Sequence, residues 1–239
     1  MGVYRSNGDQ LVCSNHYQSE QFLNDSENIE NIEFSDSKFR FDRMSELLVQ
    51  YRPLNYLEAV GVLRNQKGLN NKDIGLGNPK ALNQLIAHHA VVFKPQANKI
   101  WISTMPYQLG EFICYDLNEV FESPQTFAAI DTLLVKREAF ADSKAFEEFE
   151  YFRKLKVKIV RFAMFGQDLE LDENQVQRFI DANPNSFEVY FSLGRYYEAK
   201  NEVCKAAKMY EIALTKEIAS KREQVSIQDT FEKLNLTCN

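Results

Sequence analysis

The chain has 239 residues, of which 44% are hydrophobic and 26% charged, so it can form a sizeable core. Its formal net charge of −6 at pH 7 argues against general nucleic-acid binding, because phosphate backbones require a basic protein face. The apolar runs fall short of the roughly 20 residues that cross a bilayer, so we predict no membrane span.

The first segments of the chain predict short strands followed by a loop. Strands are expected at residues 2–6 and 10–15, and the Asn7-Gly8 pair between them is typical of a hairpin turn. Residues 24–36 are polar and acidic, which favours a surface loop.

Two helices are expected next, followed by a loop. Residues 35–51 carry an apolar stripe at helical spacing, formed by Phe41, Met44, Leu47 and Leu48. A second helix is predicted over residues 56–66, because Asn55 and Glu58 make a plausible capping pair at its start. Residues 67–80 are rich in Gly and Asn, which predicts a loop.

Three strands are predicted after this loop, at residues 90–93, 99–104 and 111–117. Their alternation of apolar and polar residues is weak, as expected when one face packs on helices and the other on a second sheet. We expect Trp101, the only tryptophan, to anchor the core between the sheet and a helix.

From residue 142 onward the patterns are helical. Residues 142–162 place six residues on a broad apolar face, namely Phe146, Phe149, Phe152, Leu155, Ile159 and Phe162. A shorter helix is predicted over 172–184, where Pro184 stops it.

The most specific internal pattern is a helical hairpin at residues 187–217. Its aromatic and small residues fall at the spacings of a tetratricopeptide repeat: Tyr190, Leu193, Gly194, Tyr197, Ala206, Tyr210 and Ala213. The small residues stand where two helices would cross closely. Because about three repeats are normally needed for stability, the flanking helices must complete the stack or it must lean on the α/β part.

The cysteines and histidines give no metal or redox pattern. The four cysteines, Cys13, Cys114, Cys204 and Cys238, contain no CxxC spacing, so reduced thiols are the default expectation. His88 and His89 would point to opposite faces of a strand and could not chelate one metal ion. We therefore predict no metal site.

The segment "VCSNHYQSEQF" contains several side chains that could take part in catalysis. Cys13 is either a small buried residue of a strand or a nucleophile, and His16 is poorly placed to activate it from the opposite strand face. Asn15 is either a strand-end residue satisfying the local backbone or a donor to a developing oxyanion.

Four blocks in order carry a family resemblance: "LVCSNHYQSEQF", "SKFRFDRMSELL", "ALNQLIAHHAVVFKPQANKIWIST" and "YQLGEFICYDL". Over roughly residues 3–120 the chain resembles the acyl-CoA:6-aminopenicillanic acid acyltransferase family, peptidase family C45, of the N-terminal nucleophile hydrolases. The resemblance implies an αββα sandwich and a cysteine exposed as a new N-terminus by self-cleavage. The free α-amino group acts as the base, and the thiolate attacks an amide or thioester. The hydrolase chemistry that the resemblance implies needs neither a metal nor an organic cofactor.

The resemblance also implies roles for four residues of this chain. Asn15 would contribute to the oxyanion site, and Arg40 would orient the nucleophile or a substrate carboxylate. His16 would support Asn15 and line the substrate site. Arg43, one helical turn from Arg40, is the alternative arginine and is assigned to substrate binding.

The expected nucleophile is missing, since only fourteen residues precede Asn15 and none is a cysteine at a credible processed terminus. We therefore expect an α+β chain that is the C-terminal part of such a hydrolase, with a partial hydrolase domain at 1–140 and a helical tail at 141–239. It would need an N-terminal half or partner chain carrying the nucleophile, and would act with it on a small-molecule acyl substrate.

Two further expectations complete the prediction. A truncated sandwich should leave an apolar face or strand edge uncovered, so we expect a homodimer that covers it. The rival function is a non-enzymatic interaction module that binds a peptide or helix through the helical tail. No signal segment is seen, so the compartment stays unknown, with the cytoplasm as the default.

Overall fold

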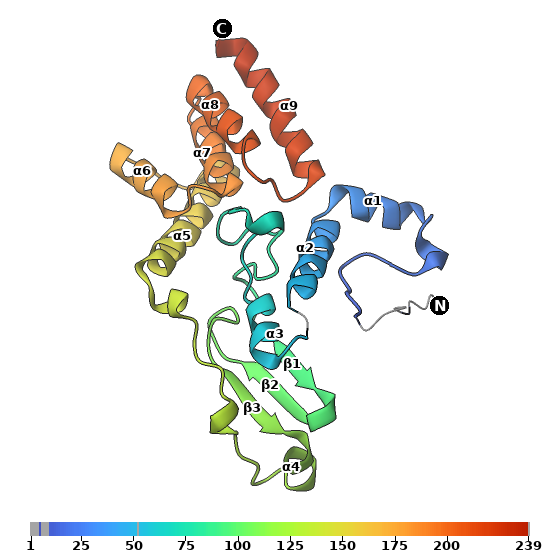
Figure 1. Ribbon diagram of the computed structural model, residues 1–239. Helices are drawn as coiled ribbons and strands as arrows, with labels where there is room; N and C mark the ends of the chain where they lie inside the picture. The colour runs from blue at the N-terminus through green and yellow to red at the C-terminus, as the bar shows by residue number, and fades with distance from the viewer. Residues whose placement is uncertain (1–4, 6–9, 52, 239) are drawn as a thin grey trace.

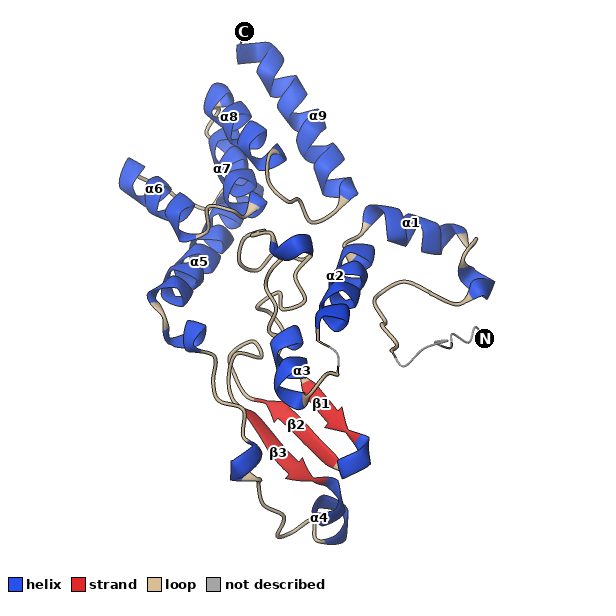
Figure 2. Ribbon diagram, viewed as in Figure 1, coloured by secondary structure: helices blue, strands red, loops and turns tan. Residues whose placement is uncertain are grey.

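The computed structural model describes Arg5 and residues 10–51 and 53–238. The fold is mixed α/β, mostly helical, with a small three-stranded antiparallel sheet (Figure 2). The sheet lies at one end of the molecule and the C-terminal helices lie at the other, with the loop after α3 between them (Figure 1). None of the helices in the described part has the length and apolar character needed to span a membrane.

The N-terminal predictions were wrong where they can be compared. Residues 10–15 form no strand; the Asn15 carbonyl accepts a hydrogen bond from the Asn31 side chain, and the Ser14 hydroxyl donates one to the Ser37 carbonyl. The predicted loop at 24–36 contains a helix, α1 (Ser26–Phe34), whose first turn is capped by the carboxylate of Asp25. The hairpin turn at Asn7-Gly8, and the strand at 2–6 apart from Arg5, lie outside the described residues.

The next two helices are confirmed. Helix α2 spans Ser37–Gln50, and α3 spans Tyr56–Leu63. Asn55 and Glu58 form a reciprocal capping box at the start of α3, in which the Asn55 side chain accepts from the Glu58 backbone and the Glu58 side chain accepts from the Asn55 backbone.

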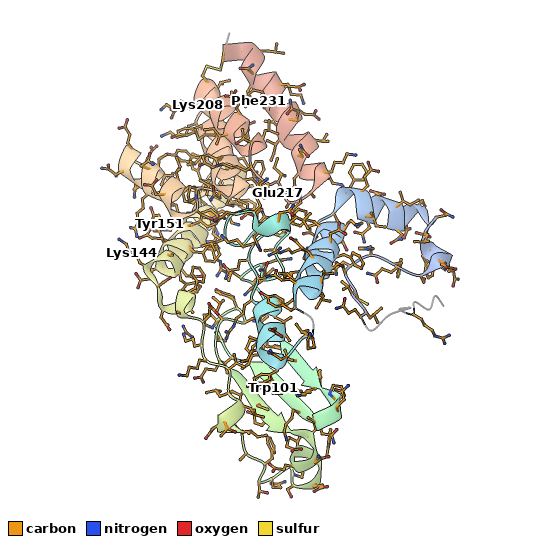
Figure 3. All side chains as sticks on the ribbon, viewed as in Figure 1. Trp101, Lys144, Tyr151, Lys208, Glu217 and Phe231 are labelled. Carbon is orange, nitrogen blue, oxygen red and sulfur yellow. A yellow bond between two sulfur atoms is a disulfide. The ribbon has the colours of Figure 1, made fainter. Side chains whose placement is uncertain are left out.

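The three predicted strands are also confirmed, as β1 (Val91–Lys94), β2 (Lys99–Ser103) and β3 (Phe112–Asp116). The strands pair in the order β1-β2-β3, and both pairings are antiparallel. Trp101 is 1% exposed, stacks on the Tyr56 ring of α3 at 4.7 Å, and donates a 2.9 Å hydrogen bond to the Leu133 carbonyl. It therefore anchors the core between sheet and helix, as predicted (Figure 3).

The opposite face of the sheet is apolar and partly open to solvent. Because side chains alternate along a strand, the register places six residues on the face away from Trp101: Val91, Phe93, Ile100, Ile102, Ile113 and Tyr115. Phe93 is 59% exposed and Ile102 38%. The expected second sheet is not found among the described residues, which form one sheet only. We call these six residues the outer sheet face.

A short helix, α4 (Leu117–Glu122), follows the sheet, and irregular chain leads to the helical tail. The tail comprises five helices: α5 (Lys144–Phe165), α6 (Glu173–Ala182), α7 (Phe187–Ala199), α8 (Val203–Leu214) and α9 (Lys221–Cys238). The first four occupy the ranges that the periodicity predicted. Their buried aromatic residues form one core with residues of α9.

Polar contacts between the loop after α3 and the tail hold the tail against the rest of the protein. The Glu217 carboxylate, between α8 and α9, pairs with Lys80 at 2.7 Å and Lys72 at 3.0 Å in the loop after α3 (Figure 3). Asn183 exchanges two 2.9 Å hydrogen bonds with the Leu76 backbone. Because these contacts join residues more than 100 positions apart, the tail packs on the α/β part in this structure.

The expectation of four reduced thiols was wrong. Cys204 and Cys238 form a disulfide that links α8 to the end of α9, with their Cα atoms 5.4 Å apart. Cys13 and Cys114 are free.

Candidate functional site

The segment that carries Asn15 is held in place by side chains of α1 and α2. Asn28, which is 2% exposed, accepts a 2.8 Å hydrogen bond from the Tyr17 amide and returns one of 3.1 Å to the Tyr17 carbonyl. Asn31 donates to the Asn15 carbonyl at 2.5 Å. These amide side chains replace the strand partner that the sequence predicted, so an irregular segment is held in one position.

Arg40 is the centre of this arrangement. Its guanidinium contacts the Asp36 carboxylate at 2.5 Å and donates a 2.9 Å hydrogen bond to the Pro79 carbonyl. It also donates through Nη2 to Oδ1 of Asn15 at 2.7 Å. The structure thus brings together Asn15 and Arg40, two residues that are 25 positions apart.

The contact with Arg40 fixes the orientation of the Asn15 amide. A guanidinium only donates hydrogen bonds, so the atom facing it must be the side-chain oxygen. The Nδ2 group therefore points away from Arg40, and it has no hydrogen-bond partner among the described residues. An uncommitted N–H donor held by a partly buried ion pair is suited to stabilise negative charge on a carbonyl oxygen.

Asn15 and Arg40 line a pocket of about 210 Å³. Its polar lining comes from the N-terminal segment, Arg40 and Gln108, and its apolar wall comes from α2, α3 and the residues before the sheet. The lining residues are Cys13, Ser14, Asn15, Arg40, Met44, Val62, Leu63, Leu82, Ala90 and Gln108. We call this the Asn15 pocket.

His16 does not line the Asn15 pocket, and it is attached to α2. Ser14 Oγ donates to the Ser37 carbonyl at 2.9 Å, and Ser37 Oγ donates to Ser14 Oγ at 3.1 Å. Because the Ser37 hydroxyl donates its proton to Ser14, it accepts a hydrogen bond from His16 Nδ1, which lies 2.8 Å away. Burial and the positive charge of Lys38 lower the pKa of His16, which favours the neutral imidazole.

Arg43 lies away from the pocket, inside the protein. Its side chain is 1% exposed, and all three guanidinium nitrogens are engaged. Nε donates to Asn65 at 3.1 Å, Nη1 to Glu46 at 2.8 Å and Nη2 to Asn71 at 2.5 Å. The bonds to Asn65 and Asn71 join α2 to the loop after α3, so Arg43 stabilises the packing of these two segments.

The two free cysteines differ in environment. Cys13 is exposed and lines the Asn15 pocket, so the prediction of a small buried strand residue was wrong. The reason is that residues 10–15 form no strand and therefore have no buried face. Cys114 is buried beside Trp101 in the sheet core, and this burial raises the pKa of its thiol.

Gln108 is the pocket residue that the sequence did not single out. It is 8% exposed, and its side-chain Oε1 is buried with no hydrogen-bond partner among the described residues. The one available signal was the sequence "PYQLG", in which Pro106 and Gly110 bracket a turn. The orphaned oxygen is visible only in the folded structure.

No described group of three or more His, Cys, Asp or Glu side chains is arranged to hold a metal ion. Comparison of the chain with protein-family models, with curated proteins and with solved structures found no match.

Proposed function

We propose that this chain is the C-terminal portion of a cysteine N-terminal nucleophile acyltransferase or amidohydrolase, similar to peptidase family C45. It would contribute one wall of an acyl-cleaving pocket, while other polypeptide supplies the attacking thiolate and its α-amino base. The substrate would be a small acyl compound with an amide or thioester bond. Alone, the chain would not turn over an amide.

The 2.7 Å hydrogen bond from Arg40 to Asn15 carries this proposal. Acyl transfer develops negative charge on the carbonyl oxygen, and a preorganised N–H donor stabilises that charge without any proton transfer. Because Arg40 occupies the oxygen of the Asn15 amide, the N–H group of that amide is free to donate to a substrate carbonyl. The same pocket has an apolar wall that suits an acyl chain. The role of Arg40 here is to position Asn15, with Asp36 and the Pro79 carbonyl fixing the guanidinium.

The outer sheet face supports the finer fold proposal. An αββα sandwich packs two sheets face to face, and this contact needs an apolar face on each. The outer sheet face offers such a surface, opposite the face covered by α3. We propose that the polypeptide carrying the nucleophile supplies the second sheet, and that this chain alone self-associates through the same face. A monodisperse monomer in sedimentation equilibrium would contradict the self-association.

Cys13 is the one described thiol in the Asn15 pocket, yet it does not meet the needs of a nucleophile. A cysteine nucleophile requires an adjacent base, and Cys13 has no hydrogen bond to one among the described residues. The neighbouring His16 directs its Nδ1 proton to Ser37. These contacts support a nucleophile from outside the chain.

The test compares this chain with the protein encoded by the longest native open reading frame, using a panel of N-acyl amides. The extended protein should release amine, and this chain should not. In the extended protein, Asn15→Leu should lower kcat by roughly 100-fold or more, since one oxyanion donor is lost. Arg40→Met should act in the same direction, while the exposed Arg161→Met on α5 serves as control.

Turnover by the extended protein that survives Asn15→Leu unchanged would remove Asn15 from the mechanism. If the extended protein cleaves no amide or thioester, the result favours the rival function, a non-enzymatic interaction module. In that case a binding module built on the tetratricopeptide-like hairpin at 187–217 is the better proposal.

A further inference from the structure

We propose that the exposed side of α5 docks on an anionic lipid surface, through cationic side chains interspersed with exposed apolar ones. Six residues form this surface, which we call the α5 basic face: Lys154, Val157, Lys158, Arg161, Met164 and Phe165. Steps of three and four positions along a helix place residues on the same side of it. The proposal goes beyond the proposed function, because no residue of α5 lines the Asn15 pocket.

The second half of α5 is cationic. Residues 153–165 contain five lysine and arginine side chains and no aspartate or glutamate. Two of these cations are compensated, since Arg153 pairs with Glu150 at 2.8 Å and Lys156 pairs with Glu188 of α7 at 2.7 Å. The other three are exposed, and their side chains have neither an ion pair nor a hydrogen bond among the described residues: Lys154, Lys158 and Arg161. They leave uncompensated positive charge on a chain whose formal net charge is −6.

Three apolar side chains lie among these cations and are open to solvent. Val157 is 47% exposed, Met164 55% and Phe165 71%. Phe165 is the last residue of α5, and the chain turns at Gly166, where a Cβ would meet no described atom within 4 Å. The apolar end of the α5 basic face therefore has open space beside it. Large apolar side chains exposed together indicate an interaction surface.

The opposite side of α5 belongs to the core. Its buried residues are Phe149, Phe152, Leu155 and Ile159, and the Phe152 ring packs on the Phe179 ring of α6 with centres 5.2 Å apart. The α5 basic face is therefore the convex outer side of one helix. Docked helices and extended peptides are held in grooves or at sheet edges, so a convex surface suits a flat layer better than a peptide.

A bilayer surface with anionic headgroups complements both kinds of side chain. The headgroups attract the cations, and the boundary beneath them accepts apolar side chains to a depth of about 5–10 Å. A nucleic acid would satisfy the cations alone, because its phosphate backbone offers no apolar layer to Met164 and Phe165. The net charge of −6 opposes adsorption through other faces, whereas screening over about 8 Å limits this repulsion once the α5 basic face makes contact. The first carboxylate after the face, Asp168, lies beyond its apolar end.

The test is sedimentation of this chain with lipid vesicles. Vesicles of phosphatidylcholine with about 30% phosphatidylserine should give a partition coefficient roughly tenfold or more above that of pure phosphatidylcholine vesicles. Raising the ionic strength to about 1 M, where charges are screened over about 3 Å, should remove most of this difference.

Two variants remove the charge and the apolar contact separately. The double variant Lys154→Gln/Lys158→Gln should lower partitioning onto the anionic vesicles by about fivefold for each cation removed. Phe165→Ser, which leaves the charge unchanged, should lower it by roughly tenfold. Because all three positions are exposed, the variants should fold, and a circular dichroism spectrum of each one establishes this.

Matched controls make the same changes elsewhere on the protein. Lys208→Gln/Lys233→Gln removes two exposed lysines of α8 and α9, neither of which has an ion pair among the described residues (Figure 3 labels Lys208). Leu236→Ser removes a side chain of α9 that is 83% exposed. Both controls should partition like the wild-type chain.

Three results would overturn the proposal. The first is equal partitioning of the wild-type chain onto both kinds of vesicle. The second is an equal loss in the two double variants, since the attraction would then come from overall charge and not from the α5 basic face. The third is binding to soluble poly-L-glutamate, lost in Lys154→Gln/Lys158→Gln, without binding to vesicles. That result would assign the face to an acidic protein segment.

Discussion

The hydroxyl of Ser37 and Nδ1 of His16 lie 2.8 Å apart, and this contact joins the start of α2 to the segment that carries Asn15. Ser37 is fully buried; its carbonyl accepts a hydrogen bond from the Ser14 hydroxyl, and its own hydroxyl donates one to Ser14 Oγ. The Asn15 pocket is therefore built on a polar network, in which helix residues replace a strand partner. We expect the position of the segment that carries Asn15 to depend on these hydrogen bonds.

Ser37→Ala should loosen the segment without unfolding the protein. It removes the hydroxyl that serves both Ser14 and His16, and a lost hydrogen bond of about 1 kcal/mol corresponds to five- to tenfold faster local opening. Amide hydrogen exchange of residues 14–17, measured by mass spectrometry, reports this change. Ser45→Ala in the same helix is the matched control, because among the described residues its hydroxyl bonds only the Phe41 carbonyl one turn back. Equal exchange in both variants would show that Ser37 does not hold the segment.

Gly194→Ala should destabilise the helical tail, although alanine is the better helix former. A Cβ at Gly194 would lie 2.6 Å from the Tyr210 ring, where α7 crosses α8. Overpacking of this kind costs about 1–3 kcal/mol in the free energy of unfolding. Gly61→Ala in α3 is the control, since nothing lies within 4 Å of its new Cβ, and it should be neutral or stabilising by up to about 1 kcal/mol. Urea unfolding checks both, and a stabilised Gly194→Ala would refute the close crossing.

Glu217→Gln should weaken the attachment of the tail at neutral pH but have little effect in acid. Burial alone would raise the pKa of Glu217, but hydrogen bonds from Lys80 and Lys72 and their positive charges lower it below its ordinary value. A carboxylate with a lowered folded pKa stabilises the protein above its unfolded pKa of about 4.3, and this contribution is lost as the pH falls through the folded pKa.

The free energy of unfolding should therefore fall by about 1 kcal/mol in Glu217→Gln at pH 7, with the difference shrinking toward pH 3. Urea titrations at both pH values measure it. Glu211→Gln, at an exposed position of α8 without an ion pair among the described residues, should stay within about 0.5 kcal/mol of the wild-type protein at both. A difference for Glu217→Gln that is the same at pH 3 and pH 7 would rule out the ionised carboxylate as its cause.

The four cysteines should react in three classes with a thiol reagent such as 5,5′-dithiobis(2-nitrobenzoate). Cys13 is exposed and should react in the native protein, whereas buried Cys114, with its raised thiol pKa, should react only after unfolding. Cys204 and Cys238 should react only after reduction. Cys13→Ser should abolish the native reaction. Four reactive thiols in unfolded protein that has never met a reductant would exclude the disulfide.

Local patterns predicted the regular elements well wherever the elements bury an apolar face. The capping pair at Asn55 and Glu58 marked the start of α3, and the strand around Trp101 was placed within one residue at its end. The predictions failed in the N-terminal segment, where polar side chains, and not a buried apolar face, fix the position of the backbone. Residues 10–15 form no strand, and the Asn15 carbonyl accepts instead from Asn31, a residue 16 positions away. Within 24–36, α1 begins at the Asp25 cap and its exposed carboxylates pair with Lys221 and Arg222 of α9.

The sequence by itself predicted the three strands of the sheet and the tail helices α5 to α8, since hydrophobic periodicity and caps act over a few residues, but it did not predict α9. Through the family resemblance it also named Asn15 and Arg40, with Arg43 as the alternative arginine. The tertiary structure alone decided that Arg40 turns the Asn15 amide outward, that Arg43 is sealed inside, and that the Gln108 oxygen is left unpaired. The physical reason is that hydrogen-bond direction and burial depend on neighbours brought together by folding, which no local pattern of residues records.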